Sequence, residues 1–127
     1  MKMSLDNASG VNVVKSYEPG RVQIRDQVFT TSMIVLPKLL LPDWEPRQAA
    51  SLRAVHFQPI LQRRPEIVIV GTGETQVFPD AGVFAALMDL GIGFEVMHNR
   101  AACRTYNILL AEDRRAALAL ILADDAP

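Results

Sequence analysis

A run of apolar residues at positions 67–70, Ile-Val-Ile-Val, constrains the fold of this 127-residue chain more than any other stretch. Isoleucine and valine favour strands, and an unbroken apolar run is typical of a strand that is covered on both faces. The run stops at Gly71-Thr72-Gly73, where two glycines allow a tight turn. These residues predict a buried strand that ends abruptly in a turn.

A helix and a second strand follow this turn. Pro79 presets the backbone for a first helical turn, apolar residues recur at helical spacing over residues 83–90, and Gly91 provides a left-handed end. Residues 94–98 then form the next predicted strand. A strand, a crossover helix and a strand make a βαβ unit, whose connection is right-handed in nearly all known cases.

The first third of the chain has the pattern of a small antiparallel meander. Residues 11–17 are rich in strand-forming side chains, and residues 21–25 alternate polar with apolar side chains. Pro19-Gly20 between them is typical of a type II turn. Residues 28–36 form a third predicted strand, which is apolar enough to enter the main sheet.

The other segments carry weaker signals. Prolines and polar residues predict a loop at positions 37–46, and residues 47–57 favour a short helix. Asn99 is a good N-cap for a helix through Leu110. Residues 115–122 fit a helix by their alanine and leucine content, and a buried strand by their continuous apolar run, so the pattern leaves both open.

Together these segments predict a single α/β domain over residues 1–127, with a disordered lead-in at residues 1–10. Half of the residues are apolar, which is enough for a substantial core. The alternation of strands and helices after Ser32 predicts a largely parallel central sheet with helices on at least one face. The amino-terminal hairpin is an added antiparallel part.

Charge and composition exclude several classes of function. The net charge of −1 gives no basic patch for nucleic acid, so no nucleic-acid partner is expected. The chain has no secretory leader pattern and no apolar run long enough for direct membrane insertion. One cysteine forms no internal disulfide and fits a reducing compartment, so a cytoplasmic location is expected. No feature fixes the oligomeric state.

The Gly71-Thr72-Gly73 turn lies at the carboxyl end of a predicted strand, where open α/β sheets tend to bind ligands. It begins like a dinucleotide fingerprint, but Gln76 stands where the third glycine belongs. The simplest interpretation is a tight structural turn. An alternative is a small-anion site made by the backbone amides, with the Thr72 hydroxyl beside them.

Cys103 has two interpretations. A helix amino terminus and the neighbouring Arg100 and Arg104 would lower the pKa of a thiol, so a reactive thiol is physically possible, with His98 as its base. Free cysteines are more often small buried side chains, and a cysteine with one histidine lacks the orienting third group of a triad. The packed interpretation is therefore the stronger one.

Arg104, Thr105, Tyr106 and Asn107 place four hydrogen-bonding side chains in one helical turn. No single face can bury all four without partners. They are solvated, or they line a polar pocket beside the glycine turn, or they bind neighbouring backbone. We favour the last interpretation, with a ligand or partner role as the alternative.

Other chemistry has little support in the sequence. One cysteine and two distant histidines supply no metal-ligand cluster, and the carboxylates form no catalytic pair. We therefore expect no catalytic residues, no metal and no cofactor.

Two segments, PEIVIVGTGETQ and GIGFEVMHNRAACRTYNILLAEDRR, closely resemble the Mth938-like domain family, a domain family of unknown function. The resemblance covers roughly residues 11–122. It implies a three-layer α/β fold with a central mixed sheet, and it implies that residues 115–122 return as a strand. The turn before that strand usually has glycine where this chain has Asp113, and aspartate tolerates the left-handed region well enough to keep it.

The eukaryotic relatives in that family include a mitochondrial assembly factor for respiratory complex I and an adipogenesis-associated protein. The resemblance therefore implies a non-enzymatic role through protein contacts, in assembly of a respiratory or other membrane-associated complex. The alternative is a small-ligand or anion-binding protein, even an enzyme. The expected ligand or partner surface consists of the positions at which this chain matches the family, Gly71, Thr72, Gly73, Arg104, Thr105, Tyr106 and Asn107.

Overall fold

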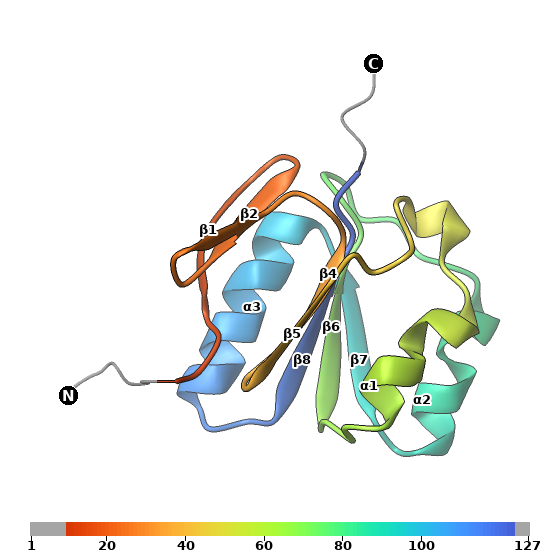
Figure 1. Cartoon of the computed structure of the whole chain (residues 1–127). Helices are drawn as coiled ribbons and strands as arrows, with labels where there is room; N and C mark the ends of the chain where they lie inside the picture. Colours follow the sequence, from red (N-terminus) through yellow and green to blue (C-terminus); the bar gives the residue numbers. More distant parts are fainter. Residues whose placement is uncertain (1–9, 124–127) are drawn as a thin grey trace.

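The computed structural model describes residues 10–123, and a five-stranded sheet runs through its centre (Figure 1). The predicted buried strand is β6, Ile67–Gly71. The strands lie in the order β5-β4-β8-β6-β7, where the other four are β4 (Met33–Leu36), β5 (Leu39–Pro42), β7 (Gly93–Met97) and β8 (Ala116–Leu120). Most of the predicted lead-in, residues 1–9, lies outside the described residues.

The sheet is mixed, as expected. β6 pairs in parallel with both β7 and β8, whereas β4 pairs antiparallel with both β8 and β5. Only β4 therefore runs against the other strands of this sheet. The parallel pairing of β6 and β7 across the intervening residues confirms the predicted βαβ unit.

The carboxyl-terminal segment at residues 115–122, for which the local pattern left helix and strand open, contains the strand β8, as the family resemblance implies. Ala116, Leu118 and Leu120 belong to the core on one face of the sheet, and Ala117 and Ala119 belong to the core on the other. All five are fully buried. Because both faces are covered, the strand needs no polar alternation, and its apolar run looks locally like a helix. Asp113 adopts φ 65° in the turn before it, as the family resemblance implies.

One face of the sheet is covered by helix α3 (Asn99–Ala111) and by a second, three-stranded sheet (Figure 1). The second sheet is the predicted antiparallel meander, β1 (Val14–Glu18), β2 (Arg21–Ile24) and β3 (Gln27–Phe29). The single strand expected at residues 28–36 is wrong, because the chain leaves the small sheet after Phe29 and enters the central sheet at Met33.

The other face is covered by short helical pieces. These are α1 (Gln58–Leu61), α2 (Ala85–Asp89) and the 3-10 turns Ala49–Ser51, Ala54–Phe57 and Ala81–Phe84. The helix expected at residues 47–57 is wrong. Its α-helical turn begins at Gln58 instead, with Pro59 in the first turn, where proline is tolerated because no intrahelical amide is needed. The helix predicted after Pro79 is correct in place but begins with a 3-10 turn.

The loop expected at residues 37–46 contains a strand, which the sequence does not predict because the prolines on either side indicate a loop. Leu39–Pro42 is β5, at the edge of the sheet, with Pro42 as its last residue. An edge strand leaves one side of its backbone unpaired, so a proline costs it little. The sheet is therefore one strand wider than the sequence predicts.

Candidate functional site

The glycine turn is shaped by close packing against α3. A β-carbon at Gly71 would lie 2.5 Å from Oδ1 of Asn99 and 2.8 Å from Cδ1 of Leu120. Glycine at this position therefore lets the helix approach β6 closely. Gly73 has a different reason, because its φ of 106° is one that side chains with a β-carbon rarely adopt.

The polar groups of this turn already have partners inside the protein. The amide of Thr72 donates to the Met97 carbonyl at 3.0 Å, and the amide of Gly73 donates to Oδ1 of Asn99 at 3.0 Å. The Thr72 hydroxyl donates to the Thr75 carbonyl at 2.7 Å. The geometry therefore opposes the anion site expected at Gly71–Gly73, because these amides have no donor capacity left for an anion.

Asn99 is not the N-cap that the sequence predicts. His98 caps α3, its Nδ1 accepting from the amide of Ala101 at 3.3 Å. Asn99 is only 1% exposed, and its side chain donates to the Ile121 carbonyl at 2.9 Å and to the Tyr17 hydroxyl at 3.0 Å. Together with the bond from Gly73, these contacts make Asn99 the junction of the turn, β1 and the chain after β8.

Tyr17 extends this junction to the surface. Its hydroxyl donates to the carboxylate of Glu74, and the guanidinium of Arg100 lies 5.5 Å from the centre of its ring. Burial, followed by the hydrogen bond to Glu74, raises the pKa of Tyr17, so the phenol remains a neutral donor. Sequence reasoning missed Tyr17 and Glu74, because nothing local links positions so far apart in the chain.

The polar turn of α3 is divided among several partners. Asn107 brackets one residue of β1, accepting from the amide of Val14 at 2.9 Å and donating to its carbonyl at 2.8 Å. The hydroxyl of Tyr106, which is fully buried, donates to the Asn12 carbonyl at 3.0 Å. These two residues therefore bind backbone, which is the interpretation favoured from the sequence.

The rest of that polar turn does not complete a pocket. Thr105 donates to the sulfur of Met97 at 3.4 Å, and Arg104 is exposed. Asn107 lies eight residues beyond Asn99, about 12 Å along the helix axis. Asn107 is therefore not placed to share one pocket with the glycine turn.

Cys103 is a packed core residue. It is 4% exposed, and burial raises the pKa of its thiol to about 12, while nearby Arg100 opposes that change only weakly. The lowering of the pKa expected from the helix terminus and the arginines is wrong. His98, the proposed base, uses its Nδ1 to cap the helix. The thiol is protonated at neutral pH, and the sequence argument for reactivity no longer holds.

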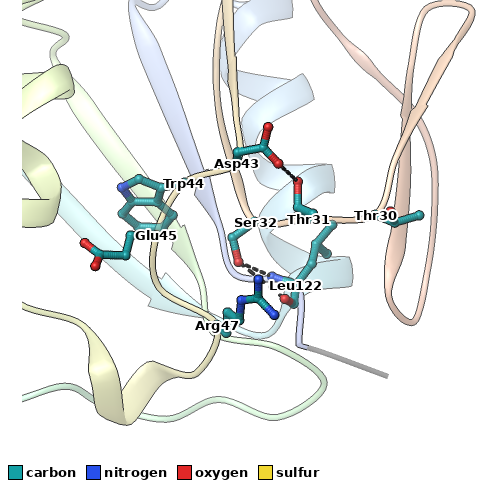
Figure 2. A pocket seen from close by; sticks show the side chains of 8 residues that line it. All are labelled: Thr30, Thr31, Ser32, Asp43, Trp44, Glu45, Arg47 and Leu122. Carbon is teal, nitrogen blue, oxygen red and sulfur yellow. Dashed lines mark hydrogen bonds between the residues drawn. The ribbon is translucent and has the colours of Figure 1, made fainter. Parts of the chain in front are cut away.

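A polar pocket of about 300 Å³ lies where the chain passes from β3 to β4 (Figure 2). The hydroxyl of Ser32 forms two hydrogen bonds with the backbone of Leu122, accepting from its amide at 2.9 Å and donating to its carbonyl at 3.3 Å. Thr31 donates to the carboxylate of Asp43 at 3.0 Å. Several of its polar groups thus serve to hold the pocket wall together. Its lining is Thr30, Thr31, Ser32, Asp43, Trp44, Glu45, Arg47 and Leu122.

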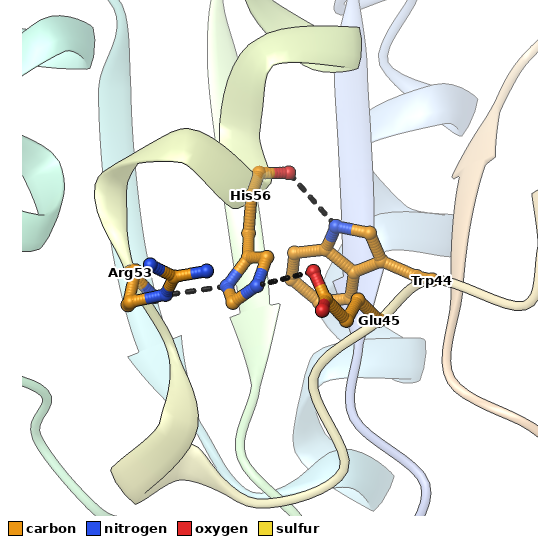
Figure 3. Close-up of polar contacts among 4 residues, drawn as sticks. All are labelled: Trp44, Glu45, Arg53 and His56. Carbon is orange, nitrogen blue, oxygen red and sulfur yellow. Dashed lines mark hydrogen bonds and ion pairs between the residues drawn. The ribbon is translucent and has the colours of Figure 1, made fainter.

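His56 lies next to this pocket and is fully engaged (Figure 3). Its Nδ1 accepts from the amide of Arg53 at 2.9 Å, so Nε2 carries the proton and faces the carboxylate of Glu45 at 3.0 Å. Trp44 donates from its indole to the His56 carbonyl at 2.8 Å. With both ring nitrogens occupied, His56 holds the loop together and is not placed to act as a base. Within residues 10–123 no group of side chains is arranged to hold a metal ion.

An apolar groove of about 500 Å³ lies beside the edge strand β7, and we call it the β7 groove. Phe84 and Phe94 stack in it with ring centres 4.2 Å apart. Phe78 and Met88 are 71% and 63% exposed. No sequence pattern indicates this surface, because its residues come from a loop, a helix and a strand. Its lining is Gln76, Phe78, Pro79, Ala81, Phe84, Met88, Phe94, Glu95 and Val96.

Comparison with known sequences gives one family and several relatives. Residues 14–121 match the model of a family described as protein of unknown function (DUF498/DUF598). The chain is 32% identical over 116 residues to a Danio rerio protein, NADH dehydrogenase (ubiquinone) 1 alpha subcomplex assembly factor 3. That match covers 90% of this chain and 66% of the relative, and the match to the Xenopus tropicalis protein of the same name covers 48% of it. The chain thus spans between about half and two thirds of these relatives.

Solved structures with the same fold agree with this match. A Xanthomonas campestris protein superposes with a TM-score of 0.83 at 32% identity, covering all of this chain and 96% of that one. A Mth938-like domain from Bordetella pertussis superposes with a TM-score of 0.79 at 28% identity, covering 99% of this chain and 95% of that domain. The expected resemblance and the expected three-layer fold are both confirmed.

Proposed function

The chain belongs to the DUF498/DUF598 family of proteins of unknown function, and we propose that it acts by binding another protein at the β7 groove. The observation that carries this proposal is the exposure of Phe78 and Met88 over an aromatic floor. Large apolar side chains gathered on a surface are typical of a protein interface. Burying them against a partner would stabilise the complex by about 2 kcal/mol for each large side chain.

The relatives support a role in assembly. The Danio rerio relative is named as an assembly factor of NADH dehydrogenase, and we carry that role over as a proposal. In this proposal the chain is a non-enzymatic binding protein that takes part in assembly of a respiratory or other membrane-associated complex. Its use of Cys103 and His56 as packing and hydrogen-bonding residues is consistent with such a role.

The location of the protein is part of the same proposal. No helix within residues 10–123 combines the length and the apolar character needed to cross a bilayer. A cytoplasmic location remains a prediction from the sequence. The rival proposal, binding of a small ligand or anion by Gly71–Gly73 with Arg104 and Asn107, is the weaker one, because the amides of Thr72 and Gly73 and the side chain of Asn107 already have partners inside the protein.

Site-specific photo-crosslinking in the cells that make the natural protein tests this proposal. A photoreactive amino acid replaces Phe78 or Met88, and matched control positions are Val55 and Ile108, which are 53% and 51% exposed and lie outside the groove. We expect the groove positions to give a defined protein adduct that mass spectrometry identifies and that the controls lack. Equal adducts from all four positions, or none from the groove, would contradict a partner at this surface.

A further inference from the structure

The segment that builds the β7 groove has a one-sided charge. Residues 71–97 contain Glu74, Asp80, Asp89 and Glu95, whereas all 13 lysines and arginines of the chain lie outside this segment. The chain as a whole is nearly neutral, with a net charge of −1. The negative charge of this surface is therefore local and is balanced by cations elsewhere on the molecule.

Three of these carboxylates belong to the groove lining or directly follow or precede a lining residue in the chain. Glu95 is part of the lining, Asp80 stands between the lining residues Pro79 and Ala81, and Asp89 follows Met88. All three acids are exposed. Among the ion pairs found within residues 10–123, none includes any of the three. An apolar floor with an unneutralised acidic rim complements a surface that is apolar and basic.

The edge of β7 is partly blocked for strand addition. Gln76 donates from its side chain to the Val96 carbonyl at 2.8 Å, so the loop before α2 already occupies a hydrogen-bonding group of the edge strand. A partner strand would have to displace this bond. A helix that inserts side chains between α2 and β7 leaves it intact, so the geometry favours a helix as the occupant.

Other occupants fit the charges less well. Two copies of this chain that meet through the same face would bring like carboxylates together. A membrane surface rich in anionic lipid would be repelled by the acidic rim. A basic partner helix has neither difficulty.

We propose that the β7 groove binds a positively charged amphipathic helix of a partner protein. The apolar face of that helix covers Phe78 and Met88, and its Lys or Arg residues face Asp80, Asp89 and Glu95. This inference rests on the proposed function, because it specifies the chemistry of the partner at the same surface. Apolar burial provides most of the affinity, and the charges determine which helices are accepted.

Titration of the whole chain with two designed helical peptides tests the charge preference. One peptide has leucine at helical spacing (i, i+3, i+4, i+7) and lysine at the positions between, and the other has glutamate in place of every lysine. NMR spectra of the isotope-labelled protein report both affinity and location. We expect only the lysine peptide to bind, with shift changes centred on residues 76–96 and with affinity that weakens as salt is added.

Two matched variants locate the charges that matter. The triple variant Asp80→Lys, Asp89→Lys, Glu95→Lys is expected to weaken binding of the lysine peptide about tenfold or more. The control variant Glu18→Lys, Asp26→Lys, Glu112→Lys changes three exposed acids elsewhere by the same total charge and is expected to have a much smaller effect. Circular dichroism checks that both variants are folded.

Several outcomes would overturn the inference. These are equal binding of both peptides, no binding of either, shift changes outside the groove, or equal weakening by the two triple variants. Binding to phosphatidylglycerol vesicles that Met88→Ser abolishes would identify a membrane surface instead, and a dimer that Met88→Ser dissociates would identify a second copy.

The two proposals can fail separately. A partner crosslinked at positions 78 and 88, without any preference between the peptides, would leave the proposed function standing and remove only the basic helix. A clear preference for the lysine peptide, without a cellular partner crosslinked at these positions, would support the charge preference of the groove and remove the proposed function in cells.

Discussion

The two faces of the central sheet use their side chains in opposite ways. On the α3 face, polar side chains reach across the fold and are consumed by internal hydrogen bonds, as Asn99 and Asn107 show. On the α2 face, the chain leaves Phe78 and Met88 exposed beside an aromatic pair. Internal satisfaction indicates a role in stability, whereas exposed apolar surface indicates a role in recognition.

Replacing Asn99 with alanine should give the largest loss of stability. The change removes the acceptor for the amide of Gly73 and the donor to the Ile121 carbonyl, leaving buried polar groups without partners. We expect the free energy of unfolding to fall by about 3 kcal/mol. Urea unfolding of the variant, with Arg104→Ala on the same helix as an exposed control, measures this. A loss no greater than that of the control would show that the α3 face is not held together by this junction.

Replacing Asn107 with alanine should cost less, because the site is only half-buried and water can replace part of the lost bonding. It removes both bonds to Val14, which hold the start of β1 against α3. The free energy of unfolding should fall by about 2 kcal/mol. The stability of Asn107→Asp, which keeps only the acceptor, should lie between those of the natural chain and the alanine variant. Hydrogen exchange at Val14 should accelerate in the alanine variant. Unchanged protection there would contradict the anchoring role.

The raised pKa of the Cys103 thiol, which is buried on the α3 face, makes the stability of the protein depend on pH. The pKa of this thiol is raised from 9.0 to about 12 in the folded protein. Above pH 9 the unfolded chain therefore loses this proton while the folded protein keeps it, so stability present at pH 8 declines as pH rises. Between pH 8 and pH 10 we expect a loss of about 1 kcal/mol from this group.

Urea unfolding of the natural chain and of Cys103→Ala at both pH values separates this contribution from others. The variant is needed because burial also raises the pKa of Tyr17 and Tyr106, which adds a loss of the same sign. The natural chain should lose more stability than the variant. Identical losses would show that the thiol is not buried as described.

Replacing Phe78 with serine should have the smallest effect on stability. Its ring is 71% exposed and contributes little to the fold, so we expect a change within about 0.5 kcal/mol. Binding to a partner should nevertheless be lost. Thermal unfolding of this variant measures the stability, and crosslinking from position 88 in the same variant measures partner binding. A large loss of stability would remove the distinction between the two faces.

The candidate site was harder to predict than the fold, and particular residues show why. The apolar run at residues 67–70 and the end of α2 at Gly91 are local signals, and both are confirmed. Tyr17 and Glu74 meet only because β1 and the glycine turn both lie against the start of α3. The grouping of Gly71–Gly73 with Arg104 and Asn107 stays a prediction, and its weak point is Asn107, which lies about 12 Å beyond Asn99 along the helix axis and binds the backbone of Val14.

By itself, the sequence determined the elements with strong local patterns, including the buried strand, the crossover unit and the amino-terminal meander. Only the tertiary structure decided that His98 caps α3, that Asn99 joins the glycine turn to β1, and that Phe78 and Met88 share an exposed groove. The physical reason is the range of the forces. Local steric preference and periodicity are written in neighbouring residues, whereas burial and hydrogen-bond partnership depend on segments that meet only after folding.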